Sequence, residues 1–191
     1  MKRWMPLAIV IIATILLFFI LQRAGLMKTI SPEELKASIE LTDIETKWVK
    51  KIYMPWPQQL TLVPAISFRV KNLTDKPLRY INFNAVFKLK DDYENLGDSF
   101  LSAIRGEPIM PGELSEVILL KSNYGVEGKS LNSFKNNPHW RMSFVRLFAQ
   151  SKGSQHVLLG EWDISKKIDF KEPEPFPPPK KEKKPPLQQG A

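Results

Sequence analysis

The chain has 191 residues, of which 43% are hydrophobic and 25% charged, with 16 prolines, no cysteine and a formal net charge of +8. This length fits one domain of ordinary size with appendages. The lack of cysteine excludes disulfide scaffolds, thiolate metal sites, thiol catalysis and lipid attachment at a cysteine. The excess of basic residues lies in residues 1–30 and 171–191, and the middle of the chain is nearly neutral. A nucleic-acid-binding domain concentrates its basic residues on its folded part, so we expect no nucleic-acid partner.

An uncharged apolar segment runs from Trp4 to Leu21. At about 1.5 Å per residue, a helix of this length just crosses a hydrocarbon core of about 30 Å. A cleaved signal peptide has a similar start, but the small-x-small cleavage site is missing after the apolar run. We therefore predict that residues 1–30 form an uncleaved transmembrane anchor. The basic tip of Lys2 and Arg3 is expected to stay in the cytoplasm while the rest of the chain is translocated.

The folded domain is predicted to begin with a short helix. Ser31, Pro32 and Glu34 occupy the N-cap, N1 and N3 positions of a capping box, and we expect the helix to end near Ser38. Beyond this point the sequence changes to short alternating runs divided by turn residues. This change predicts that the domain, residues 31–170, is all-β.

The clearest strand is Ala65–Lys71, where apolar and polar side chains alternate. Turn residues fill positions 72–77, and we expect the next strand, Leu78–Lys90, to pair with it as a hairpin. Five further strands are expected at Ile39–Lys50, Ser99–Arg105, Ser115–Lys121, Arg141–Gln150 and Val157–Ile164. About seven short strands with no repeated helix between them predict an immunoglobulin-like β-sandwich.

Three segments of this region carry a family resemblance. The first is a Phe-x-Leu-x-Asp signature, the second is the run from Phe68 to Pro77, and the third is a Pro-Gly-Glu turn. The signature and turn residues are Phe87, Leu89, Asp91, Pro111 and Gly112. Together they resemble the FxLYD domains, small extracytoplasmic β-sandwich modules of bacterial envelope and lipoprotein-like proteins, although a lysine replaces the signature tyrosine. The resemblance covers roughly residues 39–121 and implies a fold and a location, with no functional residue carried over.

Catalytic patterns are missing from the sequence. His139 and His156 have no second metal ligand at helical spacing, and no nucleophile elbow, zinc-protease, Walker or dinucleotide-binding motif occurs. We therefore expect a non-catalytic protein without cofactor or metal.

Two weaker binding patterns have simpler explanations as turns. Calcium could use hard oxygen ligands in the acidic segment, but a solvated hairpin turn explains the same residues, Asp91, Asp92, Glu94 and Asp98. The sequence Asn72-Leu73-Thr74 is a glycosylation sequon, and its place between two strands also indicates a turn.

The strongest candidate interaction surface is a loop in which aromatic residues and lysines stand beside two prolines. Its residues are Lys50, Lys51, Tyr53, Met54 and Trp56. Such a composition suits a membrane headgroup zone or a protein interface. The alternative is that Trp56 folds back and covers one end of the sandwich. Further along, Leu131, Phe134 and Trp140 are predicted to close the edge of the sandwich.

Residues 171–191 contain seven prolines and five lysines and cannot bury a core. We expect a disordered, extended tail that serves as a spacer of at most about 65 Å. Its lysines could attach to anionic lipid or polymer, and Pro177–Lys180 could enter an aromatic groove.

The sequence as a whole predicts a single-pass protein of the cytoplasmic membrane whose periplasmic or otherwise extracytoplasmic domain binds an envelope protein as an adaptor. The alternative is a carrier of lipid or another apolar ligand. A carrier would need a cavity between the sheets, where we otherwise expect four phenylalanines to pack together, namely Phe83, Phe87, Phe144 and Phe148. The oligomeric state stays open.

Overall fold

The computed structural model describes residues 31–90, 95–104, 106–152 and 154–173, together with 11–12 and 14–16. Within these residues no helix is long and apolar enough to cross a membrane. Most of the predicted membrane segment, Trp4–Leu21, lies outside the described residues, as does nearly all of the predicted tail.

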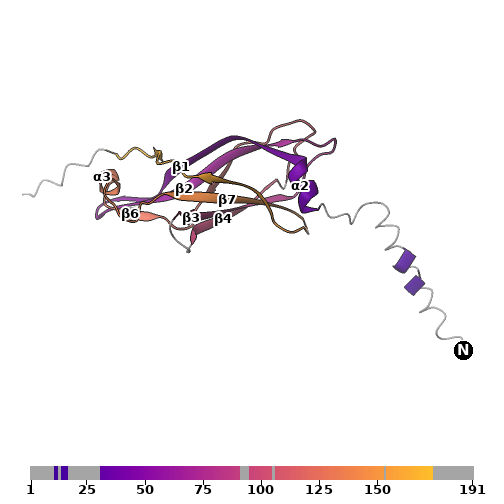
Figure 1. The fold of residues 1–191 in the computed structure, drawn as a ribbon, viewed down its shortest axis with the longest axis horizontal. Coiled ribbons are helices and arrows are strands. Elements are labelled where there is room, and N and C mark those ends of the chain that lie inside the picture. The colour runs from indigo at the N-terminus through magenta and orange to yellow at the C-terminus, as the bar shows by residue number, and fades with distance from the viewer. Residues whose placement is uncertain are drawn as a thin grey trace, which may run out of the picture.

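The described strands form two sheets, which confirms the predicted all-β sandwich (Figure 1). One sheet has the order β5-β2-β1-β9, with β6 also beside β2, and the other has the order β4-β3-β7-β8. The strands of the first sheet are β1 (Ile39–Pro55), β2 (Gln58–Asn72), β5 (Ile118–Lys121), β6 (Val126–Gly128) and β9 (Ile168–Asp169). Those of the second are β3 (Ile81–Leu89), β4 (Asn95–Ile104), β7 (Ser143–Ser151) and β8 (Val157–Asp163).

The core lies between the sheets and is closed at both ends by short helices. Phe68 of β2 meets Phe83 of β3 edge to face, with ring centroids 5.1 Å apart. Helix α2 (Pro32–Ser38) begins and ends where the sequence predicted, and it buries Leu35 at one end of the domain. Helix α3 (Leu131–Phe134) lies at the opposite end of the long axis (Figure 1). There Phe134 is buried against Trp140, as predicted.

All seven predicted strands are present, and the two further ones, β6 and β9, have only three and two residues. The predicted hairpin between Ala65–Lys71 and Leu78–Lys90 is wrong, because β2 and β3 belong to different sheets. The reason is that β2 is an interior strand. It pairs with β1 on one side and with β5 and β6 on the other, so it has no free edge for β3.

The longest paired unit is the β1–β2 hairpin, whose register runs from Ile39 opposite Asn72 to Pro55 opposite Gln58. Strand β1 has 17 residues and continues five positions beyond the predicted end at Lys50. The intervening pair, Trp56 and Pro57, forms the turn through a cis peptide bond. Pro55 is itself paired with Gln58, so most of the segment predicted as a loop is the end of β1.

Asn72 joins the loops at the α2 end of the sandwich. Its side-chain Nδ2 donates to the carbonyl oxygens of Lys76 and Ile109 at 2.8 and 2.9 Å, and its Oδ1 accepts from the N–H and hydroxyl of Thr74 at 2.8 Å each. Its backbone carbonyl accepts from the N–H of Gly112, whose φ of 77° favours glycine. Asn72 is completely buried, so the folded domain does not offer the sequon nitrogen to a glycan.

Replacing Asn72 with alanine is expected to destabilise the domain by about 2–4 kcal/mol, because buried polar groups of two loops lose their partners. Urea unfolding of the full-length protein in detergent measures the effect. Thr74→Ala is the matched control: it leaves three of the four side-chain hydrogen bonds of Asn72 in place and should cost about 1 kcal/mol. Equal losses for the two variants would contradict the central role of Asn72.

Candidate functional site

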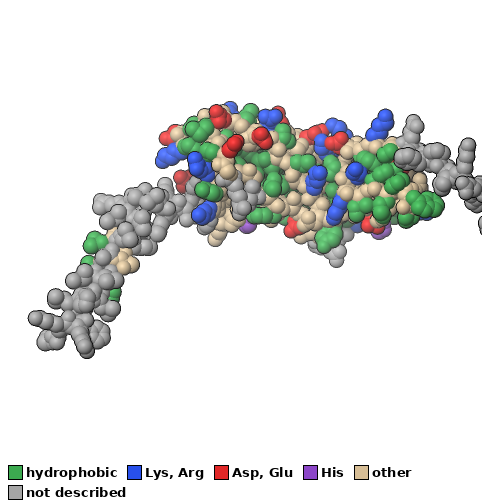
Figure 2. Space-filling model, turned by 180° about the vertical axis from the view of Figure 1, so that it is seen from behind, with side chains coloured by type: hydrophobic (Ala, Val, Ile, Leu, Met, Phe, Trp, Pro, Cys, Tyr) green, Lys and Arg blue, Asp and Glu red, His purple; other side chains and the backbone are tan. Residues whose placement is uncertain are grey.

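The tip of the β1–β2 hairpin presents the most exposed large hydrophobic side chain among the described residues. Trp56 is 90% exposed, and the neighbouring Met54 is 38% exposed. The alternative in which Trp56 folds back over the sandwich is therefore wrong. In Figure 2 hydrophobic side chains gather at the end of the domain away from the N-terminal segment. The hairpin holds Trp56 in solvent because the pairing continues to Pro55, leaving only two residues for the turn.

The other predicted residues of the loop support the tip. Tyr53 packs against Phe170 with ring centroids 5.4 Å apart, and the Lys50 Nζ lies 5.5 Å from the centre of the same ring. Lys51 donates its Nζ to the backbone oxygen of Asn123. The structure therefore divides the predicted set: Trp56 and Met54 are available for contact, whereas Tyr53, Lys50 and Lys51 fix the hairpin to neighbouring segments.

Phe170 is the residue of this site that the sequence analysis missed. It reaches Tyr53 because β9 pairs in parallel with β1, with Ile168 opposite Trp48 and Asp169 opposite Val49. In the sequence, Phe170 is an aromatic residue just before a proline-rich segment. This position indicates where the domain ends, but it does not indicate which residue Phe170 contacts. The chain thus leaves the sandwich beside the hairpin that carries Trp56.

An ion-pair network fixes β9 to β1. Lys167 Nζ lies 2.5 Å from Glu45 Oε1, and Lys47 Nζ lies 2.7 Å from Asp169 Oδ2 and 3.4 Å from Glu45 Oε2. The hydrogen bond from Lys167, helped by Lys47, lowers the pKa of Glu45. The hydrogen bond from Lys47 lowers the pKa of Asp169, and the same bond raises the pKa of Lys47. Both carboxylates are therefore ionised at neutral pH.

Tyr124 is a second exposed aromatic residue on this part of the domain, with 71% of its surface accessible. The next residue, Gly125, lies so close to β2 that an added Cβ would be 2.0 Å from the backbone oxygen of Leu62. Leu62 is itself opposite Lys50 in the hairpin. This close approach holds the Tyr124 loop against the side of the hairpin.

The described residues that resemble the FxLYD signature lie in the core or in a turn. Phe87 is completely buried in the core, and Leu89 ends β3 half-buried. Pro111 and Gly112 form the exposed turn whose glycine N–H bonds to Asn72, and Asp91 lies outside the described residues.

The candidate ligands for metal ions do not assemble in the described part of the chain. No group of three or more His, Cys, Asp or Glu side chains is close enough there to hold a metal. Asp98 lies in β4 and accepts a hydrogen bond from Asn123 Nδ2 at 3.0 Å, while residues 91–94 lie outside the description. His139 and His156 are both exposed.

The expected packing of four phenylalanines between the sheets is half wrong. Phe83 and Phe87 are completely buried, but Phe144 and Phe148 lie on the outer face of β7. The inward positions of β7 are taken by Val145, Leu147 and Ala149. Because β7 has apolar residues on both faces, alternation alone did not show which set faces the core.

No protein-family model and no curated protein matches the chain. Among solved structures, a Bordetella pertussis protein is 13% identical with a TM-score of 0.38, over 67% of this chain and 93% of its own. A protein from Archaeoglobus fulgidus is 12% identical with a TM-score of 0.34, over 66% and 98%. The ligand-binding region of serine-glutamate repeat protein A of Enterococcus faecium is 15% identical with a TM-score of 0.27, over 63% and 86%. Similarities at this level carry no argument about function.

The ion-pair network predicts that Lys47→Met lowers the stability of the domain at pH 6 and that this loss shrinks in acid. Carboxylates with lowered pKa values stabilise the fold above their ordinary pKa, and this contribution is lost as the pH falls through the lowered value. The difference in thermal midpoint between the two proteins should therefore decrease below about pH 4. Lys36→Met, an exposed lysine on α2, is the control for net charge. A difference that stays constant down to pH 2 would contradict the role of the network.

Proposed function

We propose that the chain is a single-pass, membrane-anchored module of a bacterial cell envelope that binds another envelope protein without catalysis. The observation that carries this proposal is the 90% exposure of Trp56 at the tip of the hairpin. A tryptophan so exposed gains more free energy on contact than any other side chain type of the tip, and Trp is enriched among the residues that dominate protein interfaces.

We also propose that the sandwich is immunoglobulin-like, and the strand order supports this. The order β4-β3-β7-β8 corresponds to strands C′, C, F and G of an immunoglobulin-like sandwich, and β1, β2 and β5 correspond to A, B and E. Two of the segments that resemble FxLYD domains meet at Asn72, whose backbone N–H donates to the oxygen of Glu113. The proposed relation to that family rests on the resemblance of these segments in sequence.

The membrane anchor is supported by the composition of residues 4–21 and by their few described members. Ile11, Ile12, Ile15 and Leu16 are helical, and each exposes at least half of its surface. Exposed apolar residues on a helix are expected where lipid is the solvent. The proposed orientation places the sandwich outside the cytoplasm.

The position of the tip favours a protein partner over lipid headgroups. Strand β1 starts directly after α2, at the end where the N-terminal segment joins, and it ends at Pro55. At about 3.3 Å per residue its 17 residues place the turn roughly 50 Å from α2. Because the anchor joins the domain at the α2 end, the length of β1 allows Trp56 to lie beyond the headgroups of its own membrane.

The tip is also preorganised for binding. Pro55 is paired with Gln58, and Tyr53 is packed against Phe170, so little backbone freedom remains to be lost in a complex. The carrier alternative would need a cavity in the centre of the core, where Phe68, Phe83 and Phe87 are completely buried.

Trp56→Ala is expected to reduce recovery of the protein partner at least about tenfold, as for a residue that dominates an interface. Intact cells producing the full-length protein are crosslinked, the protein is extracted from the membrane, and co-purifying proteins and lipids are quantified by mass spectrometry. The thermal midpoint should change by less than about 2 °C, because the removed side chain is exposed.

Tyr80→Ala serves as the matched control, since Tyr80 is an exposed aromatic residue on the loop that precedes β3. It should leave recovery of the partner unchanged. Unchanged recovery with Trp56→Ala would exclude the tip as the contact surface. A bound lipid without any protein partner would contradict the adaptor function and support the carrier.

A further inference from the structure

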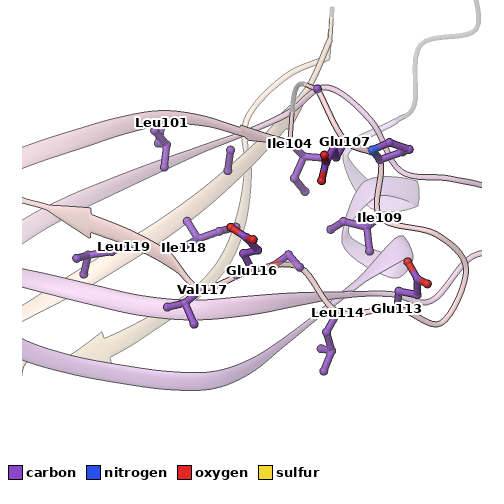
Figure 3. A pocket seen from close by; sticks show the side chains of 14 residues that line it. Leu101, Ile104, Glu107, Ile109, Glu113, Leu114, Glu116, Val117, Ile118 and Leu119 are labelled. Atoms are coloured by element: carbon purple, nitrogen blue, oxygen red, sulfur yellow. Dashed lines mark hydrogen bonds between the residues drawn. The ribbon is translucent and has the colours of Figure 1, made fainter.

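A groove of about 480 Å³ lies on the open side of the sandwich, between β4 of one sheet and the segment that leads into β5 of the other (Figure 3). Leu101 and Ile104 line it from the β4 side, and Val117 to Leu119 line it from the β5 side. Its volume falls within the range of about 300–1,000 Å³ typical of ligand sites. The sequence analysis did not find it, because the two walls come from different sheets.

The floor of the groove is apolar and partly open to solvent. Ile104, Ile109 and Ile118 are buried beneath it, while Val117 and Leu114 expose about half of their surfaces. Apolar side chains gathered in a concave site mark a binding surface more specifically than single exposed residues do.

The charged residues that the structure describes in the lining of the groove all have one sign. Its described lining includes three carboxylates, Glu107, Glu113 and Glu116, and no lysine or arginine. Figure 3 shows these carboxylates beside the apolar residues of both walls. The three carboxylates of this lining favour cationic groups over anionic ones.

The strands beside the groove are the outer strands of their sheets in the described part of the chain. An outer strand presents unpaired backbone N–H and C=O groups, which pair readily with an extended polypeptide. Contacts at both ends limit the accessible length: Asn123 N–H donates to Asp98 O at one end, and Leu78 pairs with Ile109 at the other.

We propose that this groove binds an extended segment of a partner protein in which apolar side chains alternate with lysine or arginine. The apolar side chains would cover Val117 and Leu114, and the basic side chains would pair with the three glutamates. Charge complementarity decides against anionic lipids, whose headgroups the same glutamates repel. The groove lies near α2 and Asn72, far from Trp56, so this site does not depend on the proposed role of the hairpin tip.

Two synthetic peptides with blocked ends test the proposal on the full-length protein in an uncharged detergent. One has the sequence Lys-Leu-Lys-Val-Lys-Leu-Lys, and the other has glutamate in place of each lysine. Fluorescence anisotropy should show binding of the basic peptide and none of the acidic one. Val117→Arg, which places bulk and positive charge in the groove, should weaken binding at least tenfold.

Met142→Arg is the matched control, because Met142 and Val117 are 57% and 56% exposed and only Val117 lines the groove. It should leave the affinity unchanged. The double variant Glu113→Gln/Glu116→Gln keeps the shape of both side chains and should also weaken binding at least tenfold. It tests the proposal even where Val117→Arg fails to fold. Equal binding of the two peptides, or full affinity of the double variant, would overturn the proposal.

Discussion

Strand β2 is buried along nearly its whole length and has neighbours on both sides, and this position determines the arrangement of the other strands. Because β1 and β5 occupy its two edges, the chain after Asn72 has to cross to the other sheet, where β3 becomes an interior strand. The crossing is fixed by the four side-chain hydrogen bonds of Asn72. The same pairing extends β1 and β2 to the turn at Trp56, so the core of the domain and its most exposed tryptophan depend on one hairpin.

Local patterns predicted most of the elements, since each depends on neighbouring residues only. The capping box at Ser31 marked the start of α2, and the alternation in 81–89 showed which side of β3 faces the core. The pairing of β2 was predicted wrongly because turn residues signal a change of direction without showing which sheet the next strand joins. The positions of Phe144 and Phe148 were predicted wrongly for another reason. Both faces of β7 carry apolar side chains, so the alternation does not show which face is turned toward the core.

The sequence predicted which residues belong to the candidate site, but it predicted their spatial arrangement only in part. Trp56 and Met54 are exposed, as an interaction surface requires. Tyr53 and Lys50 instead contact Phe170, which lies at the C-terminal end of the domain in the sequence. Contacts of this kind are set by the parallel pairing of β9 with β1, which no local pattern shows. The groove between β4 and β5 could not be predicted for the same reason, because its walls are the edges of two different sheets.

The central claim, that the hairpin tip contacts an envelope protein outside the membrane, is tested most directly by photo-crosslinking from the tip in living cells. A photoreactive amino acid at Met54, which is 38% exposed and two residues before Trp56, leaves the tryptophan in place. The account predicts one discrete crosslinked protein, with no such product when the same probe replaces Tyr80, which is 49% exposed on the loop that precedes β3. Crosslinks to lipid alone, or identical products from the two positions, would contradict it.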